Sequence, residues 1–280
     1  MYTINCKGKL LVIDKPLVMG IINATPDSFY ESHLQKGMEA TLALADKMIG
    51  DGADILDIGG QSTRPGSARI IADEEIKRVL PVINAILTKY PDCIISIDTY
   101  HASVADIAVK NGALMVNDIS GGTMDEEMLH TVGKLNVPYC CMHIKGDPAT
   151  MQSLAQYENI TLDVLDYFIA KIEACTKAGI KDIIIDPGFG FAKNAGHNFE
   201  LLKNMASLKI LGKPILAGLS RKATIYKTLG ITADEALNGT TVLNTLALLN
   251  GASILRVHDV KEAREAVMLM GKYEEAESIG

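Results

Sequence analysis

Eight short runs of apolar and often β-branched residues recur along this 280-residue chain, and their number limits the possible folds more than any other feature. Nearly continuous apolar character predicts strands buried on both faces, as in a parallel sheet. Most intervening segments are long enough for a helix, and alternation of strand and helix indicates βα units. The runs are 17–22, 54–58, 94–98, 114–118, 137–143, 182–186, 214–219 and 253–257.

Eight βα units without a linker-like stretch favour an α/β fold of the (β/α)8 TIM-barrel type, a single domain over residues 1–280, rather than a doubly wound sheet. Glycines stand before several runs, where a helix C-cap needs positive φ. Residues 1–14 lie outside the repeat. They predict a short N-terminal β-hairpin that turns at Lys7-Gly8-Lys9, and we expect it to plug the barrel floor.

Charge and cysteine content narrow the class of protein. The formal net charge of −7 argues against a nucleic-acid or membrane-surface binder, which would carry a basic excess. The five cysteines form no Cys-x-x-Cys pair, which indicates a reducing compartment. No basic-then-apolar leader and no apolar run of about 18 residues is present. We therefore expect a cytoplasmic protein.

Polar residues gather where the predicted strands end, which is where TIM barrels build their active sites. Three of them are carboxylates, namely Asp98, Asp118 and Asp186. Each alone would be interpreted as a helix cap or an ion-pair partner, but three at one barrel mouth favour function. Together with Asn117 they could form paired hydrogen bonds to an amino-substituted heterocycle, and Met142 could line the same pocket.

Cationic groups follow the last two strands, in Ser220-Arg221-Lys222 and at Arg256 and His258, and Arg64 follows the second. Surface salt bridges would explain any one of them but not their convergence, so we expect an anionic substrate, since loops seven and eight of barrels often bind phosphate. The glycines around Phe191 suit a flat aromatic substrate, although a loop with Phe191 tucked into the core fits equally well.

Metal binding is expected to be loose. No His-x-His or Glu-x-x-His spacing occurs, which makes a tight zinc site improbable. Mg²⁺ keeps much of its water, so a Mg²⁺ ion shared with a diphosphate and held by Asn23 is compatible with the sequence.

Taken together, the strand-end loops resemble dihydropteroate synthase, a transferase family of folate biosynthesis that sulfonamides target. The resemblance runs along the whole barrel and keeps the family's order. It is carried by GIINATPDSF (20–29), DIGGQSTRPGS (57–67), ISIDT (95–99), VNDISGG (116–122), MHIKGDPATMQ (142–152), DPGFGF (186–191), GLSRKATI (218–225) and LRVHDV (255–260).

The resemblance implies condensation of 6-hydroxymethyl-7,8-dihydropterin diphosphate with p-aminobenzoate through a dissociative pterin cation, with Mg²⁺ and in a homodimer. It assigns catalysis to Asp98, Arg64 and Lys222. The implied pterin pocket comprises Asp98, Asn117, Asp186, Lys222 and Met142. The implied diphosphate and Mg²⁺ site comprises Asn23, Arg256 and His258, with Asn23 on the metal. The implied p-aminobenzoate side comprises Thr63, Arg64, Phe191 and Ser220, with Thr63 and Arg64 on a lid.

Two departures from the family pattern keep alternatives open. Gln61 stands where the family usually has Glu, and Glu31 stands near the position of a family Asp, in a loop that lacks the usual glycines. A pterin-dependent methyltransferase domain would share the barrel and the carboxylates, but it would not need the Ser-Thr-Arg-Pro-Gly loop or the Ser220–Lys222 cluster. A non-catalytic pterin-binding paralogue is the other alternative.

Overall fold

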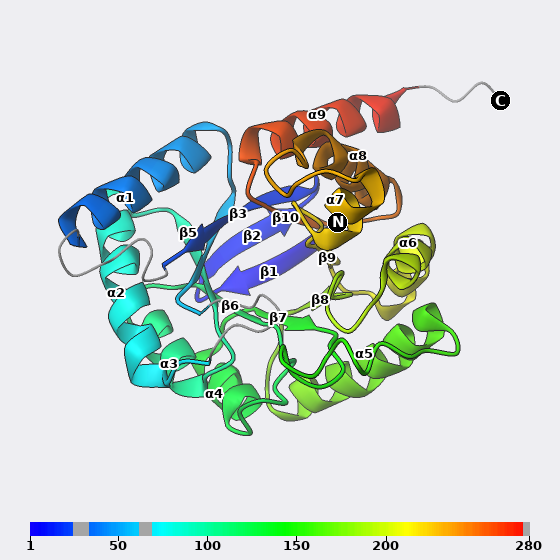
Figure 1. The fold of residues 1–280 in the computed structure, drawn as a ribbon. Helices are drawn as coiled ribbons and strands as arrows, with labels where there is room; N and C mark the ends of the chain where they lie inside the picture. Colours follow the sequence, from blue (N-terminus) through cyan, green and yellow to red (C-terminus); the bar gives the residue numbers. More distant parts are fainter. Residues whose placement is uncertain (25–33, 62–68, 277–280) are drawn as a thin grey trace.

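A computed structural model describes residues 1–24, 34–61 and 69–276 of the chain. Eight parallel strands alternate with helices that surround them (Figure 1). The strands are β3 (Leu17–Asn23), β4 (Ile55–Gly59), β5 (Ile94–Asp98), β6 (Met115–Asp118), β7 (Tyr139–Met142), β8 (Ile183–Asp186), β9 (Leu216–Ala217) and β10 (Ile254–Val257). The α-helices are α1 (Leu34–Gly50), α2 (Ala72–Lys89), α3 (Ala102–Lys110), α4 (Met128–Leu135), α5 (Ile160–Lys177), α6 (Ala195–Asn204), α7 (Ala223–Leu229), α8 (Leu237–Leu249) and α9 (Val260–Glu275).

The strands close into a barrel in the order β8-β7-β6-β5-β4-β3-β10-β9. A single parallel bridge between Ile185 and Ile215 joins the two ends of this order, supported by a 3.0 Å hydrogen bond from Ile185 N to Pro214 O. The predicted TIM barrel is therefore confirmed. All eight predicted strands are present, with ends that differ by up to a few residues.

Side chains alternate between the two faces of each strand, as the pleat requires. The outward set packs with the surrounding helices in a large apolar cluster that includes Val18, Ile58 and Val116. The inward set is apolar in the lower half of the barrel, where it includes Met19 and Ile55.

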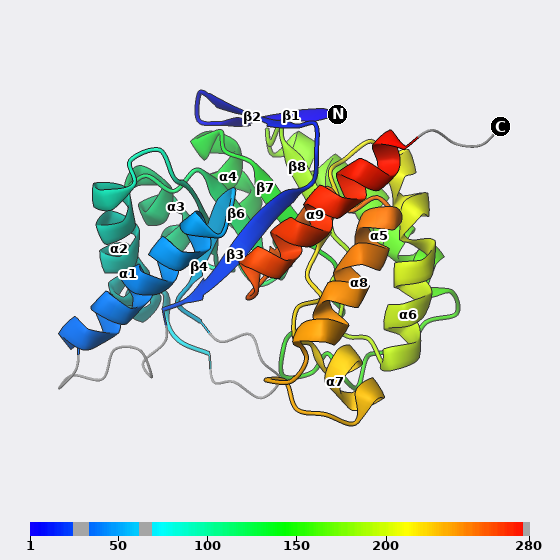
Figure 2. The ribbon, with the colours of Figure 1, turned by 90° about the horizontal axis from the view of Figure 1, so that it is seen from above.

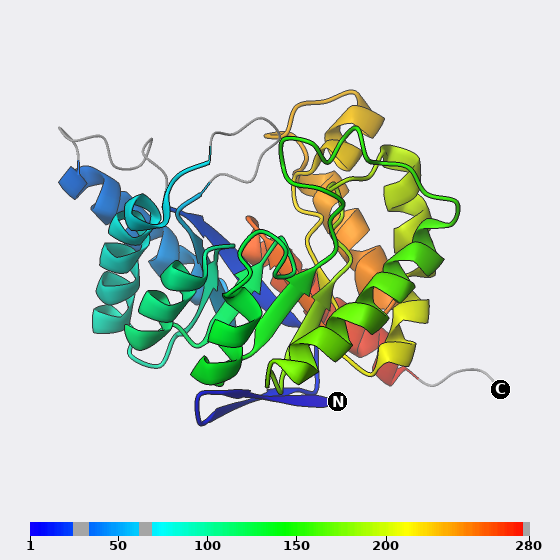
Figure 3. The ribbon, with the colours of Figure 1, turned by 90° about the horizontal axis from the view of Figure 1, so that it is seen from below.

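The predicted N-terminal hairpin is present as β1 (Tyr2–Cys6) and β2 (Lys9–Ile13), which pair antiparallel from Tyr2↔Ile13 to Cys6↔Lys9. Lys7 and Gly8 both have positive φ, 54° and 97°, as a two-residue type I′ turn demands. Ile4, Cys6 and Ile13 join the inward cluster of the barrel. The hairpin lies across the end opposite α7 (Figures 2 and 3), so it closes the floor as expected.

No helix within the described ranges is long and apolar enough to cross a membrane.

Candidate functional site

The inward positions change from apolar to polar at the carboxyl ends of the strands. Strand register places Asn23, Gly59, Asp98 and Asn117 at one level on neighbouring strands, because Asn23 pairs with Gly59, Gly59 with Asp98 and Asp98 with Asn117. Further round the barrel Met142 pairs with Asp186. Alternation turns the predicted pterin residues on β5 to β8 toward the barrel interior.

A buried ionic network crosses this interior. The Arg256 guanidinium donates through Nε to Asp57 Oδ2 and through Nη2 to Asp98 Oδ2, both at 2.6 Å. Asn117 Nδ2 donates to the same Asp57 oxygen at 2.9 Å. Asp57 is fully buried and Asp98 is 8% exposed. Four strands, β4, β5, β6 and β10, are thus joined through one cluster of polar side chains.

Burial dominates the electrostatics of Asp98. It raises the pKa of this carboxyl to about 7, since desolvation penalises the charged form, and the nearby Asp57, Asp118 and Asp186 carboxylates act in the same direction. Arg256 opposes the shift. Strongly shifted carboxyl groups in a barrel mouth mark functional sites.

Asp186 and Lys222 approach each other on the opposite side of the barrel. A Cβ added to Gly218 would lie 3.9 Å from Lys222 Nζ and 4.0 Å from Asp186 Oδ2, which is ordinary van der Waals contact, so both charged groups flank this glycine. Burial lowers the pKa of Lys222 to about 8, with Asp186 opposing. Lys222 Nζ donates to Phe189 O and lies 4.6 Å from the centre of the Phe191 ring.

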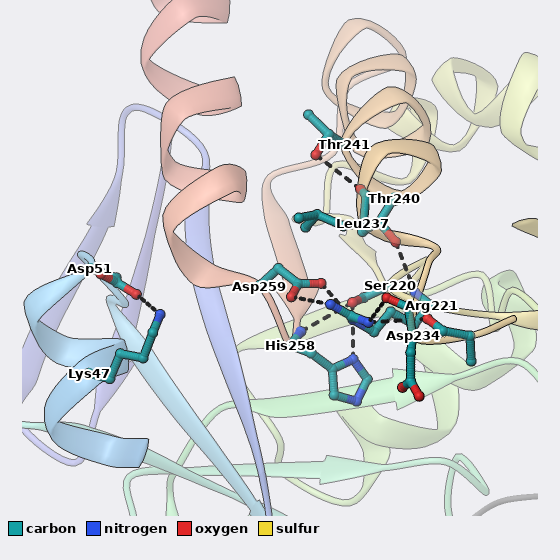
Figure 4. A network of polar contacts seen from close by, with 11 residues as sticks. Lys47, Asp51, Ser220, Arg221, Asp234, Leu237, Thr240, Thr241, His258 and Asp259 are labelled. Atoms are coloured by element: carbon teal, nitrogen blue, oxygen red, sulfur yellow. Dashed lines mark hydrogen bonds and ion pairs between the residues drawn. The ribbon is translucent and has the colours of Figure 1, made fainter. Parts of the chain in front are cut away.

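The loops after β9 and β10 are held together by polar contacts (Figure 4). Ser220 Oγ lies 3.0 Å from His258 Nδ1 and accepts from His258 N at 3.2 Å. Arg221 has a positive φ of 52° and donates to both Asp259 oxygens, at 2.9 and 2.8 Å. It also donates to Ala233 O and Asp234 O. The Arg221 guanidinium thus bridges the two loops, and the Asp259 carboxylate offsets the charge expected from the sequence to serve an anionic substrate.

Asp118 also departs from the prediction that three carboxylates face the barrel mouth. It shares the outward parity of Val116, on the helix side of β6. Its carboxylate accepts from Tyr139 Oη at 2.7 Å and from the backbone N–H groups of Ser120 and Gly122. Asp118 therefore stabilises its own loop.

Met142, 2% exposed, belongs to a small apolar cluster above the barrel that also contains Tyr100, Ile119 and Ile144, and Phe191 packs against it. Phe191 is only partly buried. Part of the Phe191 side chain is therefore accessible to solvent, and its ring lies near Lys222.

Gln61, the departure from the family pattern, is buried and accepts two hydrogen bonds through Oε1, from Ile70 N at 2.9 Å and Tyr100 Oη at 3.0 Å. A neutral amide oxygen meets both donors, so this contact requires no negative charge. Thr63, Arg64 and Glu31 lie outside the described residues.

Two buried charged residues of this region were not among the predicted site residues. Asp57 falls within the apolar run 54–58 that predicts a strand, and a carboxylate in such a run signals a buried partner. Lys193 follows the glycine-rich segment around Phe191 and is 3% exposed, with its Nζ 2.8 Å from His143 Nδ1. Asn23, the predicted metal ligand, is exposed at the end of β3. In the described part of the chain no three His, Cys, Asp or Glu side chains converge as a metal site.

Comparison with known proteins identifies relatives along the whole barrel. A family model described as "Pterin binding enzyme" matches residues 19–258. The dihydropteroate synthase of Escherichia coli K12 is 39% identical over 94% of each chain, and that of Haemophilus influenzae is 41% identical over 90% of this chain and 92% of its own. Two solved structures are each 36% identical over 98% of this chain: dihydropteroate synthase of Xanthomonas albilineans with 4-aminobenzoic acid (TM-score 0.91, 99% of that chain) and of Yersinia pestis with a sulfonamide drug complex (TM-score 0.92, all of that chain).

Proposed function

The chain belongs to the dihydropteroate synthase family of pterin-binding enzymes, and we propose that it condenses 6-hydroxymethyl-7,8-dihydropterin diphosphate with p-aminobenzoate. The products are 7,8-dihydropteroate and pyrophosphate. The observation that carries this proposal is the buried network of Asp57, Arg256, Asp98 and Asn117, which presents paired acceptors and donors at the mouth of the barrel.

Pterin recognition is assigned to Asp98, Asn117, Asp186, Lys222 and Met142. A carboxylate matches an amidine-like N–C–N edge through two parallel hydrogen bonds. Asp186 lies deep enough to make such a pair, and the Met142 thioether provides an apolar wall for a flat ring. Lys222 would donate to a ring carbonyl or nitrogen from the Asp186 side.

The proposed chemistry is dissociative. The carbon–oxygen bond breaks first and its electron pair leaves with the diphosphate, which produces a pterin methylene cation. Asp98, once ionised, stabilises the cation, while Arg256 and His258 would contact the leaving group. The nitrogen lone pair of p-aminobenzoate then forms the new C–N bond, and the nitrogen releases a proton to solvent. Positioning and electrostatics therefore supply the rate, without a strong base.

A Mg²⁺ ion fits the donor set. Two carboxylates face the single Arg256 guanidinium, so the network offers no excess positive charge to a diphosphate. Bound Mg²⁺ would supply that charge, and the amide oxygen of Asn23 is a hard ligand of the kind this ion takes alongside phosphate oxygens and water.

The p-aminobenzoate side is assigned to Phe191 and Ser220, together with Thr63 and Arg64 from outside the described residues. Arg64 is proposed to close over the bound arylamine. A relative binds a sulfonamide drug, and sulfonamides would compete with p-aminobenzoate at this same side.

Two further proposals concern the surroundings of the enzyme. Helix α8 exposes Val242, Leu246 and Leu249, which supports a homodimer formed through this face. All five cysteines are unpaired, which supports a reducing cytoplasm as the working compartment.

Pyrophosphate release tests the function. Purified protein is mixed with the dihydropterin diphosphate, Mg²⁺ and p-aminobenzoate, beside an Asp98→Asn variant. Release that requires p-aminobenzoate and falls at least about 100-fold in the variant is expected. Calorimetric binding of the pterin without release would overturn the proposal in favour of a non-catalytic paralogue.

A further inference from the structure

Lys193 is a charged side chain inside the protein, directly behind the segment that carries Phe191. Its Nζ contacts three acceptors, namely His143 Nδ1 at 2.8 Å, Gly188 O at 3.0 Å and Phe191 O at 3.0 Å. An ammonium group has three donors and no acceptor, so these contacts match its protonated form. A buried charge is costly unless it is satisfied in this way.

His143 completes the arrangement as a neutral acceptor. It is 2% exposed, and burial lowers its pKa to about 2. Burial lowers the pKa of Lys193 to about 7, with Asp186 opposing. In its protonated form Lys193 only donates, so His143 Nδ1 accepts and the imidazole proton resides on Nε2. The Tyr167 ring packs edge-on against the imidazole at 4.8 Å between centroids, which fixes its orientation.

The two carbonyls held by Lys193 are the first and last of a tight turn. Phe191 N donates to Gly188 O at 3.1 Å, and Gly190 at the third position has a φ of 82°, as a type II turn requires. Lys193 therefore links the two ends of the turn through hydrogen bonds to both carbonyls. Asn198 Oδ1 accepts from Gly190 N at 2.8 Å and secures its far side.

This turn has contacts on both sides of the proposed site. Gly188 N donates to Asp186 Oδ1 at 2.8 Å, on the pterin side. The Phe191 ring, which is assigned to the arylamine side, lies 4.6 Å from Nζ of Lys222, which is assigned to the pterin. The last residue of the turn, which Lys193 holds through its carbonyl, is Phe191 itself.

We propose that Lys193, held by His143, is a positioning residue that fixes Phe191 for the arylamine substrate. This inference rests on the proposed function. It assigns Lys193 an effect on p-aminobenzoate rather than on the pterin, because the Asp186–Gly188 contact joins residues only two positions apart and does not involve the ammonium group.

The test compares Lys193→Met with Lys9→Met, which removes a lysine that bonds Asp92 O at the opposite end of the barrel. Thermal unfolding first establishes the folded fraction of each variant. Lys193→Met is expected to raise the KM for p-aminobenzoate about tenfold, the effect of one lost charge-assisted hydrogen bond, while calorimetric affinity for the dihydropterin diphosphate stays within about threefold. Lys9→Met is expected to change neither.

A second pair of variants decides the matter if Lys193→Met does not fold. His143→Asn retains an acceptor where Nδ1 lies, and His143→Leu removes it. Only the Leu variant is expected to raise the KM for p-aminobenzoate. Equal weakening of both substrates, an unchanged KM in folded Lys193→Met, or identical behaviour of the two His143 variants would overturn the inference. Absence of pyrophosphate release from the unmodified protein would instead contradict the proposed function.

Discussion

At the scale of single residues, Arg256 compensates two buried carboxylates at once. Replacement by Met would leave Asp57 and Asp98 without their cation, and breaking a buried pair costs about 3 kcal/mol of unfolding free energy. Since Arg256 lowers the pKa of Asp98, its loss raises that pKa further.

The cost of Arg256→Met is therefore expected to depend on pH. A carboxyl whose pKa is raised in the folded state stabilises the fold below its unfolded pKa and loses that contribution as the pH rises through the folded value. Urea unfolding at pH 5 and pH 8 should show the larger loss at pH 8. A loss of the same size at both would argue against compensation of charge.

Glu75 provides a second test of buried charge. This residue of α2 is fully buried, accepts from Thr99 Oγ1 at 3.1 Å, and its pKa is raised from 4.5 to about 8, chiefly by burial. The native protein should therefore lose stability as the pH rises between these values, and Glu75→Gln should not share that loss.

The difference in unfolding free energy between Glu75→Gln and the unmodified protein should grow in favour of the variant by up to about 1.4 kcal/mol per pH unit across this range. Glu74→Gln, at the neighbouring half-exposed position, is the matched control and should give a flat difference. If this difference varied with pH in the same way for both variants, ionisation of Glu75 would not be the cause of the pH dependence.

Individual side chains also show where sequence reasoning ends. Asp98 and Asp118 look alike in the chain, since each ends an apolar run, yet one faces the barrel and the other faces the helices. Side chains alternate between the two faces of a strand, so the face that a residue occupies depends on its position in the strand, which is set by the pairing register. Asp57 finds its partner Arg256 199 positions away, which spacing along one sequence does not reveal.

At the scale of elements, the strands could be predicted because burial on both faces leaves a plain apolar signal. The seventh is the exception, since β9 covers only Leu216–Ala217 instead of 214–219. It pairs with β10 over two residues, and the bridge to β8 is made by Ile215, just before β9 begins, so little of the apolar run belongs to a ladder. The hairpin turn could be predicted at Lys7-Gly8, because a two-residue turn of this kind needs positive φ at both positions and few residue pairs adopt it.

The turn after β8 makes a prediction of its own. A Cβ at Gly188 would lie 2.1 Å from His143 O, whereas Gly212, with a similar positive φ, has nothing within 4 Å. Both Ala variants bear the left-handed strain of about 1 kcal/mol, and only Gly188→Ala adds a backbone clash. Gly188→Ala should therefore unfold at lower denaturant and bind pterin more weakly than Gly212→Ala. Equal behaviour of the two would show that β7 and β8 can separate at little cost.

At the scale of the whole molecule, the hairpin supplies the lower end of the core. Ile4→Ala, at a side chain 3% exposed, is expected to cost about 3 kcal/mol of unfolding free energy through the cavity it leaves. Leu10→Ala, 65% exposed on the same hairpin, should change it by less than about 0.5 kcal/mol. Similar values for both, measured by urea unfolding, would mean that the hairpin is not anchored to the barrel.

In the part of the chain that the structure describes, β1 and β2 close the lower end of the barrel. Both substrates of the proposed reaction, and both products, are then expected to pass the rim at the opposite end. Whichever molecule lies deepest has to arrive before the one above it and cannot depart until that one has moved. The sequence of arrivals and departures is then set by depth rather than by affinity, so a molecule trapped near the rim would hold its deeper neighbour in place without touching any residue that binds it.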